Sequence, residues 1–275
     1  MQSRTPNIWR AAVAAAVTVA TLSALPTFPV QAQQTATEID QGVERRIINT
    51  AFSDWQIMQN SIDMFYGGRR RRRTGPSLLQ QQTTRGKKLI AAGQQDFSWN
   101  PAAGGNSRAI SELVKKVPAG NRAVTTEQMK NLIVNYPMLV KALNDKGGAS
   151  LRADDVVDSQ VVSGVYAYEI LSGKDITPGQ FQAERQVTQR SWKRNVALVG
   201  SGKEYFQYLG EYYALNVGYM ALLQSIAEDP NNPERESAGK ALQQIARKLL
   251  KECYNTQDPS KITFTSTGSN YPGKK

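Results

Sequence analysis

The stretch KEYFQYLGEYYALNVGYMALLQSIAE, from Lys203 to Glu228, decides the fold class of this chain. Large apolar residues recur in it at intervals of three or four, which is the spacing of one face of an α-helix. The members of this stripe are Tyr205, Tyr208, Tyr212, Leu215 and Tyr219. Other apolar residues lie beside them, and a helix that is apolar over most of its circumference is typically buried. The stretch therefore predicts a core helix, the alternative being a surface on which tyrosine rings stack against a ligand; in both cases the phenol oxygens need polar partners.

Helical patterns of the same kind flank this stretch. Thr126 to Asn144 carries an apolar stripe that contains Pro137, which is expected to kink or split the helix. The other predicted helices are Ser107–Val117, Asp154–Leu171, Pro178–Val199 and Pro233–Tyr254. An alternating, strand-like pattern of useful length occurs only in KITFTST near the C-terminus. The fold class is therefore all-α: an irregular helical bundle of about five to seven helices with a short extended C-terminal tail.

Residues 1–32 have the pattern of a signal peptide. Arg4 and Arg10 give a positive start, the run from Ala11 to Leu25 is apolar and uncharged, and Ala32 stands at the expected cleavage point. The apolar run is shorter than the ~18 residues that a membrane-spanning helix needs, so an uncleaved anchor is the less favoured alternative. We expect export by the general secretory route to a periplasmic or extracellular location, with no membrane span in the mature form.

Three segments follow the predicted cleavage point. Residues 33–66 contain a predicted N-terminal helix, from Ala36 to Phe65, which ends at Gly67 and Gly68. Residues 67–106 are rich in Gln, Gly and Arg and poor in large apolar residues, which predicts a long flexible basic linker. Residues 107–275 contain the remaining helices and form the helical domain.

The linker contains five consecutive arginines, in YGGRRRRRTGP from Tyr66 to Pro76. They are Arg69, Arg70, Arg71, Arg72 and Arg73. This run is a candidate anion-binding site because it could neutralise several phosphates or carboxylates; the alternative is a solvated linker, the usual state of a block of like charge. The chain carries a formal charge of +11, and loss of two arginines with the signal peptide leaves +9. Such a charge favours an anionic envelope polymer or an envelope protein as partner, and the run lacks the aromatic residues that would read nucleic-acid bases.

The chain contains no histidine and a single cysteine, Cys253. The absence of histidine excludes Ser-His-Asp and Cys-His catalysis and nearly all zinc sites. With one cysteine, no intramolecular disulfide can form. Cys253 stands where a helix is expected to end, which favours a small buried hydrophobe over a reactive nucleophile. We predict no metal site and no cofactor.

Two short motifs resemble functional signatures without matching them. The segment VALVGSGKEY has Ala197 and Glu204 where a phosphate-binding loop requires glycine and a hydroxyl residue, so it predicts a turn between two helices. Ser237 and Lys240 have the S-x-x-K spacing of penicillin-recognising enzymes, but the companion S-D-N and K-T-G elements are absent.

Glu169 and Glu211 are acids embedded in apolar helical sequence. A pair of carboxylates can catalyse glycoside hydrolysis without histidine, so the two are candidate catalytic residues of a cell-wall glycan hydrolase. If buried, they need raised pKa values or basic partners such as Arg190 or Arg194. A structural ion pair or an exposed position is the alternative, because a single acid on each of two helices fixes no separation between them.

Small residues recur every four positions on two of the predicted helices. They are Gly210, Ala214 and Gly218 on one helix, and Ser159, Ser163 and Ala167 on the other. Because small residues let helix axes approach to the low end of the ~8–10 Å range, we predict that these two ridges face each other.

The C-terminal half resembles an uncharacterised family of exported bacterial proteins that is known only as a domain of unknown function. The resemblance covers Lys130 to Gly268; it depends on Asp154-Asp155-Val156-Val157-Asp158 at the start of one helix, and on Asp258-Pro259 and Thr263–Gly268 after the last. It implies a secreted helical domain with no assigned reaction and no functional residues to transfer. We predict an exported, non-enzymatic envelope binding or interaction module, the alternatives being the glycan hydrolase and non-specific binding of anionic polymers through the arginine run.

Overall fold

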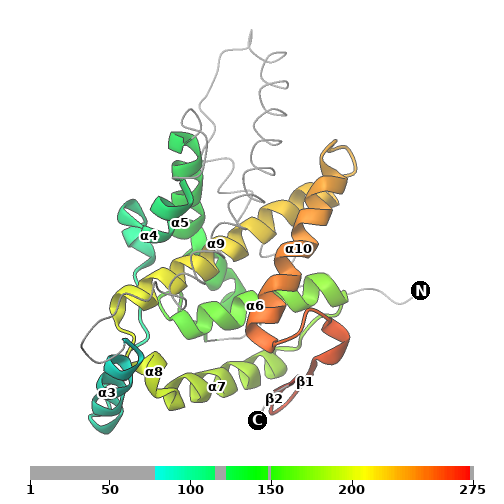
Figure 1. Ribbon diagram of the computed structural model, residues 1–275. Helices are drawn as coiled ribbons and strands as arrows, with labels where there is room; N and C mark the ends of the chain where they lie inside the picture. The colour runs from blue at the N-terminus through cyan, green and yellow to red at the C-terminus, as the bar shows by residue number, and fades with distance from the viewer. Residues whose placement is uncertain (1–77, 115–121, 148–149, 273–275) are drawn as a thin grey trace.

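The computed structural model describes residues 78–114, 122–147 and 150–272 (Figure 1). The α-helices are α3 (Leu78–Ala91), α4 (Arg108–Val114), α5 (Arg122–Gly147), α6 (Val156–Ser172), α7 (Pro178–Arg194), α8 (Val196–Val199), α9 (Lys203–Glu228) and α10 (Arg235–Tyr254). Two 3-10 helices, η2 (Pro101–Asn106) and η4 (Pro259–Lys261), and two strands, β1 (Thr263–Thr265) and β2 (Gly268–Asn270), complete the described part. The all-α class is confirmed: this part holds eight α-helices, one of them a single turn, and one small sheet.

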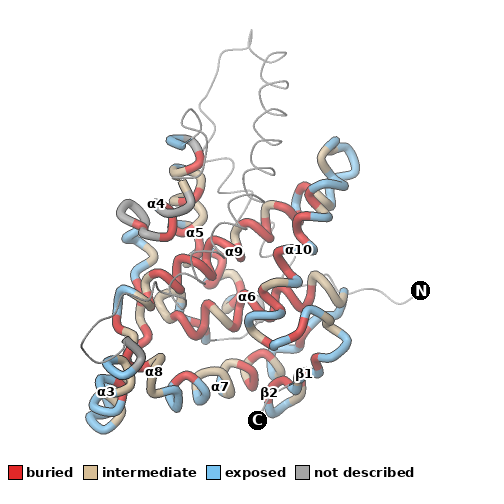
Figure 2. Tube along the Cα trace, in the orientation of Figure 1, coloured by how far each residue is buried: buried red, intermediate tan, exposed pale blue. Residues whose placement is uncertain are grey.

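Helices α6, α9 and α10 pack against one another at the centre of the molecule. Helix α5 lies against α9 on one side, and α7 runs along α6 with α3 and α8 at its C-terminal end and the β1–β2 hairpin near its N-terminal end (Figure 1). Buried residues concentrate on α6, α9 and the inner face of α10 (Figure 2). On α9, Tyr208, Tyr212 and Tyr219 are buried, so the tyrosine stripe forms part of the core as the core-helix prediction requires.

Local signals in the sequence begin and end several helices. Thr177 caps α7: its hydroxyl accepts from the Gln180 amide at 3.3 Å, and the Gln180 side chain accepts from the Thr177 amide at 3.0 Å. Pro178 follows at the first position of the helix, where its missing N–H has no consequence. Asn195 separates α7 from α8 and caps α8, so the single helix predicted over 178–199 is two helices.

Helix α5 passes through Pro137 without being split. It is also longer at both ends than the predicted Thr126–Asn144, because it begins at Arg122 and ends at Gly147. Of the two predicted effects of this proline, a kink or a split, the split is therefore wrong.

The prediction of a flexible linker over residues 67–106 is wrong for most of residues 78–106, the part that the structure describes. Residues 78–91 form α3, and the segment after it is pinned to the domain by main-chain bonds from Trp99 N to Asp154 O at 2.8 Å and from Val156 N to Phe97 O at 3.1 Å. Both aromatic side chains are buried. Two large aromatics therefore make this segment part of the core, despite its polar average composition.

The two small-residue ridges do not face each other as predicted. A Cβ atom on Gly210 would lie 2.2 Å from the Trp99 ring, and one on Gly218 would lie 2.9 Å from Leu132 of α5. The α9 glycines therefore pack against Trp99, which precedes η2, and against Leu132 of α5. Only the α6 ridge approaches α9, where Ser163 Oγ donates to the Tyr213 carbonyl at 3.3 Å.

The C-terminal tail forms an antiparallel hairpin in which Thr263 pairs with Asn270 and Thr265 with Gly268. Phe264 contacts Tyr168 and Tyr254 edge to face, which fixes the hairpin to α6 and α10. The predicted signal peptide, the helix of residues 33–66 and the arginine run lie outside the described residues. In the described part, none of the helices has the length and apolar character needed to cross a membrane.

Candidate functional site

Helix α7 carries most of the candidate functional side chains. Its basic residues are Arg185, Arg190, Lys193 and Arg194, and its one acid is Glu184. Hollows line the helix on two sides: a larger one against α6, α10 and the tail, and a smaller one against the loop before α6. The helix therefore presents charged side chains to two separate pockets.

Close packing brings α3 to the C-terminal end of α7. Gly86 of α3 and Gly200 after α8 each allow contact with the opposing backbone, since a Cβ atom on either would lie 1.8 Å from a carbonyl oxygen, that of Val196 or Gln82. Beyond α3, Gln95 Nε2 donates to the Lys193 carbonyl at 3.3 Å. The basic residues of the two helices therefore lie on neighbouring parts of the molecule.

We call this surface the α3–α7 basic face. Its members are Arg85, Lys87, Lys88, Arg190, Lys193 and Arg194, all of them exposed. None of the six forms an ion pair with a carboxylate within the described residues. By contrast, Lys141 of α5 pairs with Asp145 and Lys240 of α10 pairs with Glu236, each on its own helix. An uncompensated group of positive charges raises the local concentration of anions.

The larger hollow, which we call the Glu184 pocket, has a volume of about 500 Å³. It lies between α6, α7, the C-terminal turn of α10 and the tail residue Tyr271. Glu184 is 4% exposed, and its carboxylate accepts from the Ser269 amide at 2.7 Å and from the Thr188 hydroxyl at 3.4 Å. The first of these bonds attaches the β1–β2 hairpin to α7, so the hairpin helps to build the pocket wall.

Cys253, predicted to be a small buried hydrophobe, lies on the wall of the Glu184 pocket and is partly buried. Its thiol lies 3.9 Å from the Gln160 carbonyl, to which it donates weakly. Burial, followed by the charges of Glu252 and Glu184, raises the pKa of the Cys253 thiol well above its usual value. Because the thiolate is the reactive form, this supports the prediction that Cys253 is not a nucleophile.

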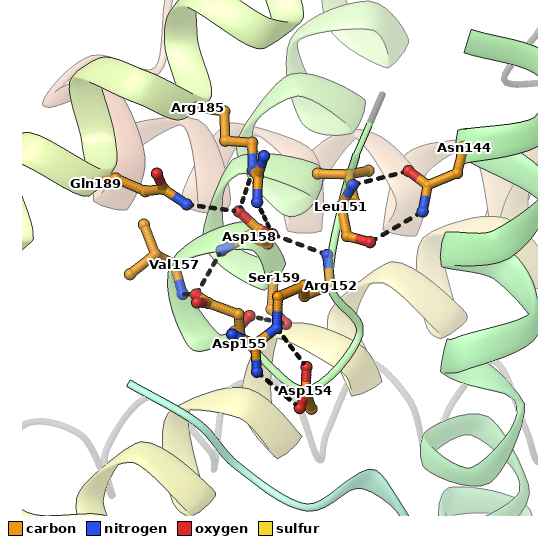
Figure 3. Close-up of polar contacts among 10 residues, drawn as sticks. All are labelled: Asn144, Leu151, Arg152, Asp154, Asp155, Val157, Asp158, Ser159, Arg185 and Gln189. Atoms are coloured by element: carbon orange, nitrogen blue, oxygen red, sulfur yellow. Dashed lines mark hydrogen bonds and ion pairs between the residues drawn. The ribbon is translucent and has the colours of Figure 1, made fainter. Parts of the chain in front are cut away.

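The acidic motif Asp154–Asp158 organises the start of α6 (Figure 3). Asp155 is the N-cap, accepting from the Val157 amide at 2.8 Å and the Asp158 amide at 3.2 Å. Asp158 is 1% exposed and receives Arg185 of α7 in a bidentate pair, at 2.6 and 2.8 Å. Asp154 forms an exposed pair with Arg152 at 2.9 Å. The motif therefore joins α6 to α7.

A second, smaller pocket of about 240 Å³ adjoins this motif. Asp96, Arg152 and Lys193 line it with Asp155 and Arg185. Burial, followed by the charge of Asp158, raises the pKa of the Asp155 carboxyl. Hydrogen bonds from Ser98 lower that of Asp96. Both signs of charge line this pocket, and the acids already have partners that hold the protein together.

Glu169 and Glu211 are both buried, but they belong to different polar clusters. Glu169 accepts from the Ile176 amide at 2.9 Å, at the end of α6. Glu211 accepts from the Ser107 hydroxyl at 2.6 Å and from Gln207 at 2.8 Å. These bonds lead to different segments of the chain, and Ser107 and Gln207, which donate to Glu211, are neutral, unlike the predicted partners Arg190 and Arg194. The structure therefore gives each carboxylate a role in joining segments of the chain.

The two signature-like motifs are ordinary helix segments and turns. Gly202 has φ 92° and begins α9 after the single turn α8, as predicted for VALVGSGKEY. On α10, Ser237 donates to the Glu234 carbonyl at 2.9 Å and Lys240 pairs with Glu236 at 2.6 Å. These residues are occupied by contacts within their own helix and its cap.

Glu184, Asp158 and Arg185 were not predicted as site residues from the sequence. Glu184 is the one acid in a basic helix, a signal that could have been noticed. The burial of Glu184 could not have been predicted, because groups that surround it come from α10 and the tail. The first of these, Cys253, lies 69 positions later in the sequence. Within residues 78–114, 122–147 and 150–272, no group of three or more acids and cysteines is placed to hold a metal ion.

The resemblance to a family of exported proteins remains a prediction, since nothing in the geometry of the helices tests it. In comparisons with protein-family models, curated proteins and solved structures, no match to this chain was found.

Proposed function

We propose that this protein is an exported, non-enzymatic binding module that binds an anionic polymer of the cell envelope through the α3–α7 basic face. The observation that carries the proposal is the group of six exposed basic residues without ion pairs on adjoining helices. A rigid helical surface keeps these charges together, so they act on one polymer segment at once. The predicted arginine run, Arg69–Arg73, would extend the same interaction along the chain before α3.

The contacts of the acidic residues support binding over catalysis. Glu169 and Glu211 hold loop and helix segments through their hydrogen bonds, and Asp158 is neutralised by Arg185. A catalytic acid pair of a glycosidase has to face the two sides of one scissile bond. The hydrogen bonds of Glu169 to Ile176 and of Glu211 to Ser107 and Gln207 hold chain segments together instead, which favours binding over glycan hydrolysis.

The proposal predicts that the protein binds an anionic polymer with a salt-dependent affinity, and that replacing three lysines of the basic face weakens this binding. Mature protein starting at Gln33 is titrated with lipopolysaccharide, an acidic glycan and DNA over a series of salt concentrations. The test variant is Lys87→Gln/Lys88→Gln/Lys193→Gln, and a second variant changes Arg69–Arg73 to serine. The matched control removes the same charge elsewhere, by Lys130→Gln/Lys141→Gln/Lys240→Gln, at residues that already pair with acids.

We expect the test variant to lose affinity and to reduce the slope of log K against log salt by about 0.7–0.9 for each contact removed, if the polymer is nucleic acid. The control should behave like the native protein. Equal affinities and equal slopes in the test variant and the control would refute the assignment of the basic face, and loss only in the serine variant would transfer the function to the arginine run.

A further inference from the structure

The Glu184 pocket contains a buried negative charge that no basic side chain neutralises. Glu184 is 4% exposed and forms no ion pair within the described residues, although its carboxylate has two hydrogen-bond donors, the Ser269 amide and the Thr188 hydroxyl. A buried carboxylate normally has a cationic partner or several strong donors. In the same molecule Asp158, which is equally buried, has both: a bidentate guanidinium and two further donors. Glu184 therefore lacks the cationic partner that Asp158 has within the described residues.

The opposite charge lies at the other end of the same pocket. Arg190 and Arg194 line it, are exposed, and form no ion pair within the described part of the chain. Arg190 is six residues beyond Glu184 on α7, which at 1.5 Å per residue places the two Cα atoms about 9 Å apart along the helix axis. The pocket thus separates a negative site from a positive site by several ångströms.

Neutral polar groups line the same pocket. Thr188 and Ser191 line the pocket on α7, and Gln160 lines it on α6. Hydroxyl and amide groups of this kind bind peptide groups, which carry one donor and one acceptor each. Val161 and Val187 provide apolar contacts in the same wall. The volume of about 500 Å³ is within the range of small-molecule sites.

We propose that the Glu184 pocket binds a short zwitterionic peptide, with its terminal ammonium group at Glu184 and its terminal carboxylate at Arg190 and Arg194. An extended chain spans about 3.3–3.6 Å per residue, so a peptide of two or three residues matches the separation of the charged ends. A purely anionic ligand would be repelled by Glu184, and a simple cation would leave the arginines unused. The site shares Arg190 and Arg194 with the α3–α7 basic face. The two proposals are nevertheless distinguishable, because the peptide test depends on Glu184 and on the two peptide ends, whereas the polymer test changes three lysines.

The test compares three forms of one peptide by isothermal titration calorimetry: trialanine, N-acetyl-trialanine and trialanine amide. The first variant is Glu184→Gln, which keeps an oxygen to accept from the Ser269 amide, so that the hairpin stays attached. The second is Arg190→Gln/Arg194→Gln, at exposed positions. Lys240→Gln/Arg247→Gln on the outer side of α10 is the control for loss of two positive charges. Thermal unfolding of each variant checks that it is folded.

We expect trialanine to bind the native protein and N-acetylation to weaken it by about tenfold to a hundredfold, the usual effect of a hydrogen bond to a charged group. In Glu184→Gln that difference between the two peptides should disappear. Amidation should weaken binding to the native protein and to the control, but not to Arg190→Gln/Arg194→Gln. Absence of trialanine binding at millimolar concentration, or equal binding of all three peptides to the native protein, would overturn the proposal.

Discussion

At the scale of single residues, Asp158 has the most completely satisfied buried charge in the described domain. Its two carboxylate oxygens accept from Arg185 Nε and Nη2, from the Arg152 amide at 2.8 Å and from Gln189 at 3.4 Å. Arg185 is itself 13% exposed at its side chain. The neighbouring pair of Arg152 and Asp154 is similar in chemistry but about half exposed on both sides. The acidic motif therefore contains a buried pair and an exposed pair that can be compared directly.

Asp158→Asn is expected to lower the free energy of unfolding by about 3 kcal/mol, because it leaves the Arg185 guanidinium partly buried without its counter-charge. Asp154→Asn, the control within the same motif, should lower it by less than about 1 kcal/mol, since exposed pairs contribute little. Urea unfolding monitored by circular dichroism measures both. Similar losses for the two variants would contradict the assigned difference in burial.

The carboxyl group of Asp155 should make the free energy of unfolding depend on pH. Burial and the charge of Asp158 raise the pKa of its carboxyl above the ordinary 3.8. A raised pKa means that the folded protein binds this proton more tightly than the unfolded chain, so the contribution to stability is present below the unfolded pKa and is lost as pH rises through the folded pKa. Asparagine caps a helix about as well and does not ionise.

Asp155→Asn should therefore become more stable relative to the native protein as the pH rises from about 3 to about 7. The quantity to measure is the difference between the two free energies of unfolding at each pH, because the other carboxyl groups, including Asp96 with its lowered pKa, contribute equally to both proteins. A difference that stays constant or decreases over this range would show that Asp155 is not destabilised by its charge.

At the scale of elements, a helix is predicted best when its apolar pattern and the residues that end it are both local in the sequence. The bounds of α9, Lys203–Glu228, match the prediction because its apolar pattern is continuous and Gly202 and Asp229 stand at its ends. The segment of Phe97 and Trp99 could not be predicted in this way. Its partners, Gln207 and Gly210, lie more than a hundred positions later, where Asn100 N donates to Gln207 at 2.8 Å. Because the segment is polar on average, its composition gave no sign that Phe97 and Trp99 belong to the core.

Gly210 is the position on α9 that admits this segment. Since an added Cβ atom would lie 2.2 Å from Trp99 Cδ2, Gly210→Ala should displace the indole and lower the free energy of unfolding by about 1–3 kcal/mol. Gly239 on α10 is the matched control: a Cβ atom there lies 3.9 Å from Ala227 Cβ, so Gly239→Ala should raise stability by about 0.5–1 kcal/mol through helix propensity. Tryptophan fluorescence during urea unfolding reports both, and stabilisation by Gly210→Ala would refute the close contact.

At the scale of the whole molecule, pockets are the least predictable feature. The Glu184 pocket needs α6, α7, α10 and the tail, which are joined only after folding, so neither the burial of Glu184 nor the exposure of Arg190 and Arg194 follows from local pattern. The predicted catalytic acids illustrate the same limit. The apolar sequence around Glu169 and Glu211 left burial and exposure both open, and their partners at Ile176 and Ser107 could be known only from the fold.

Tyrosines buried in the core should also make the protein less stable at high pH. Burial raises the pKa of the phenols of Tyr136, Tyr212 and Tyr254 above the ordinary 10.0. The folded state therefore holds these protons more tightly than the unfolded chain, and the stability that they contribute is present below about pH 10 and lost as the pH rises toward the folded values. Buried phenols should ionise together with the loss of helical circular dichroism.

Tyr212→Phe tests this link because Tyr212 donates to Glu252 Oε2 at 2.7 Å. Loss of that hydrogen bond should lower the free energy of unfolding at neutral pH by about 1 kcal/mol. Above about pH 10 the same variant should lose stability less steeply with pH than the native protein, since one fewer buried phenol releases a proton on unfolding. The two stability curves should thus converge as the pH rises. Parallel curves would show that Tyr212 ionises in the folded protein as readily as in the unfolded chain, which its position between α9 and α10 does not allow.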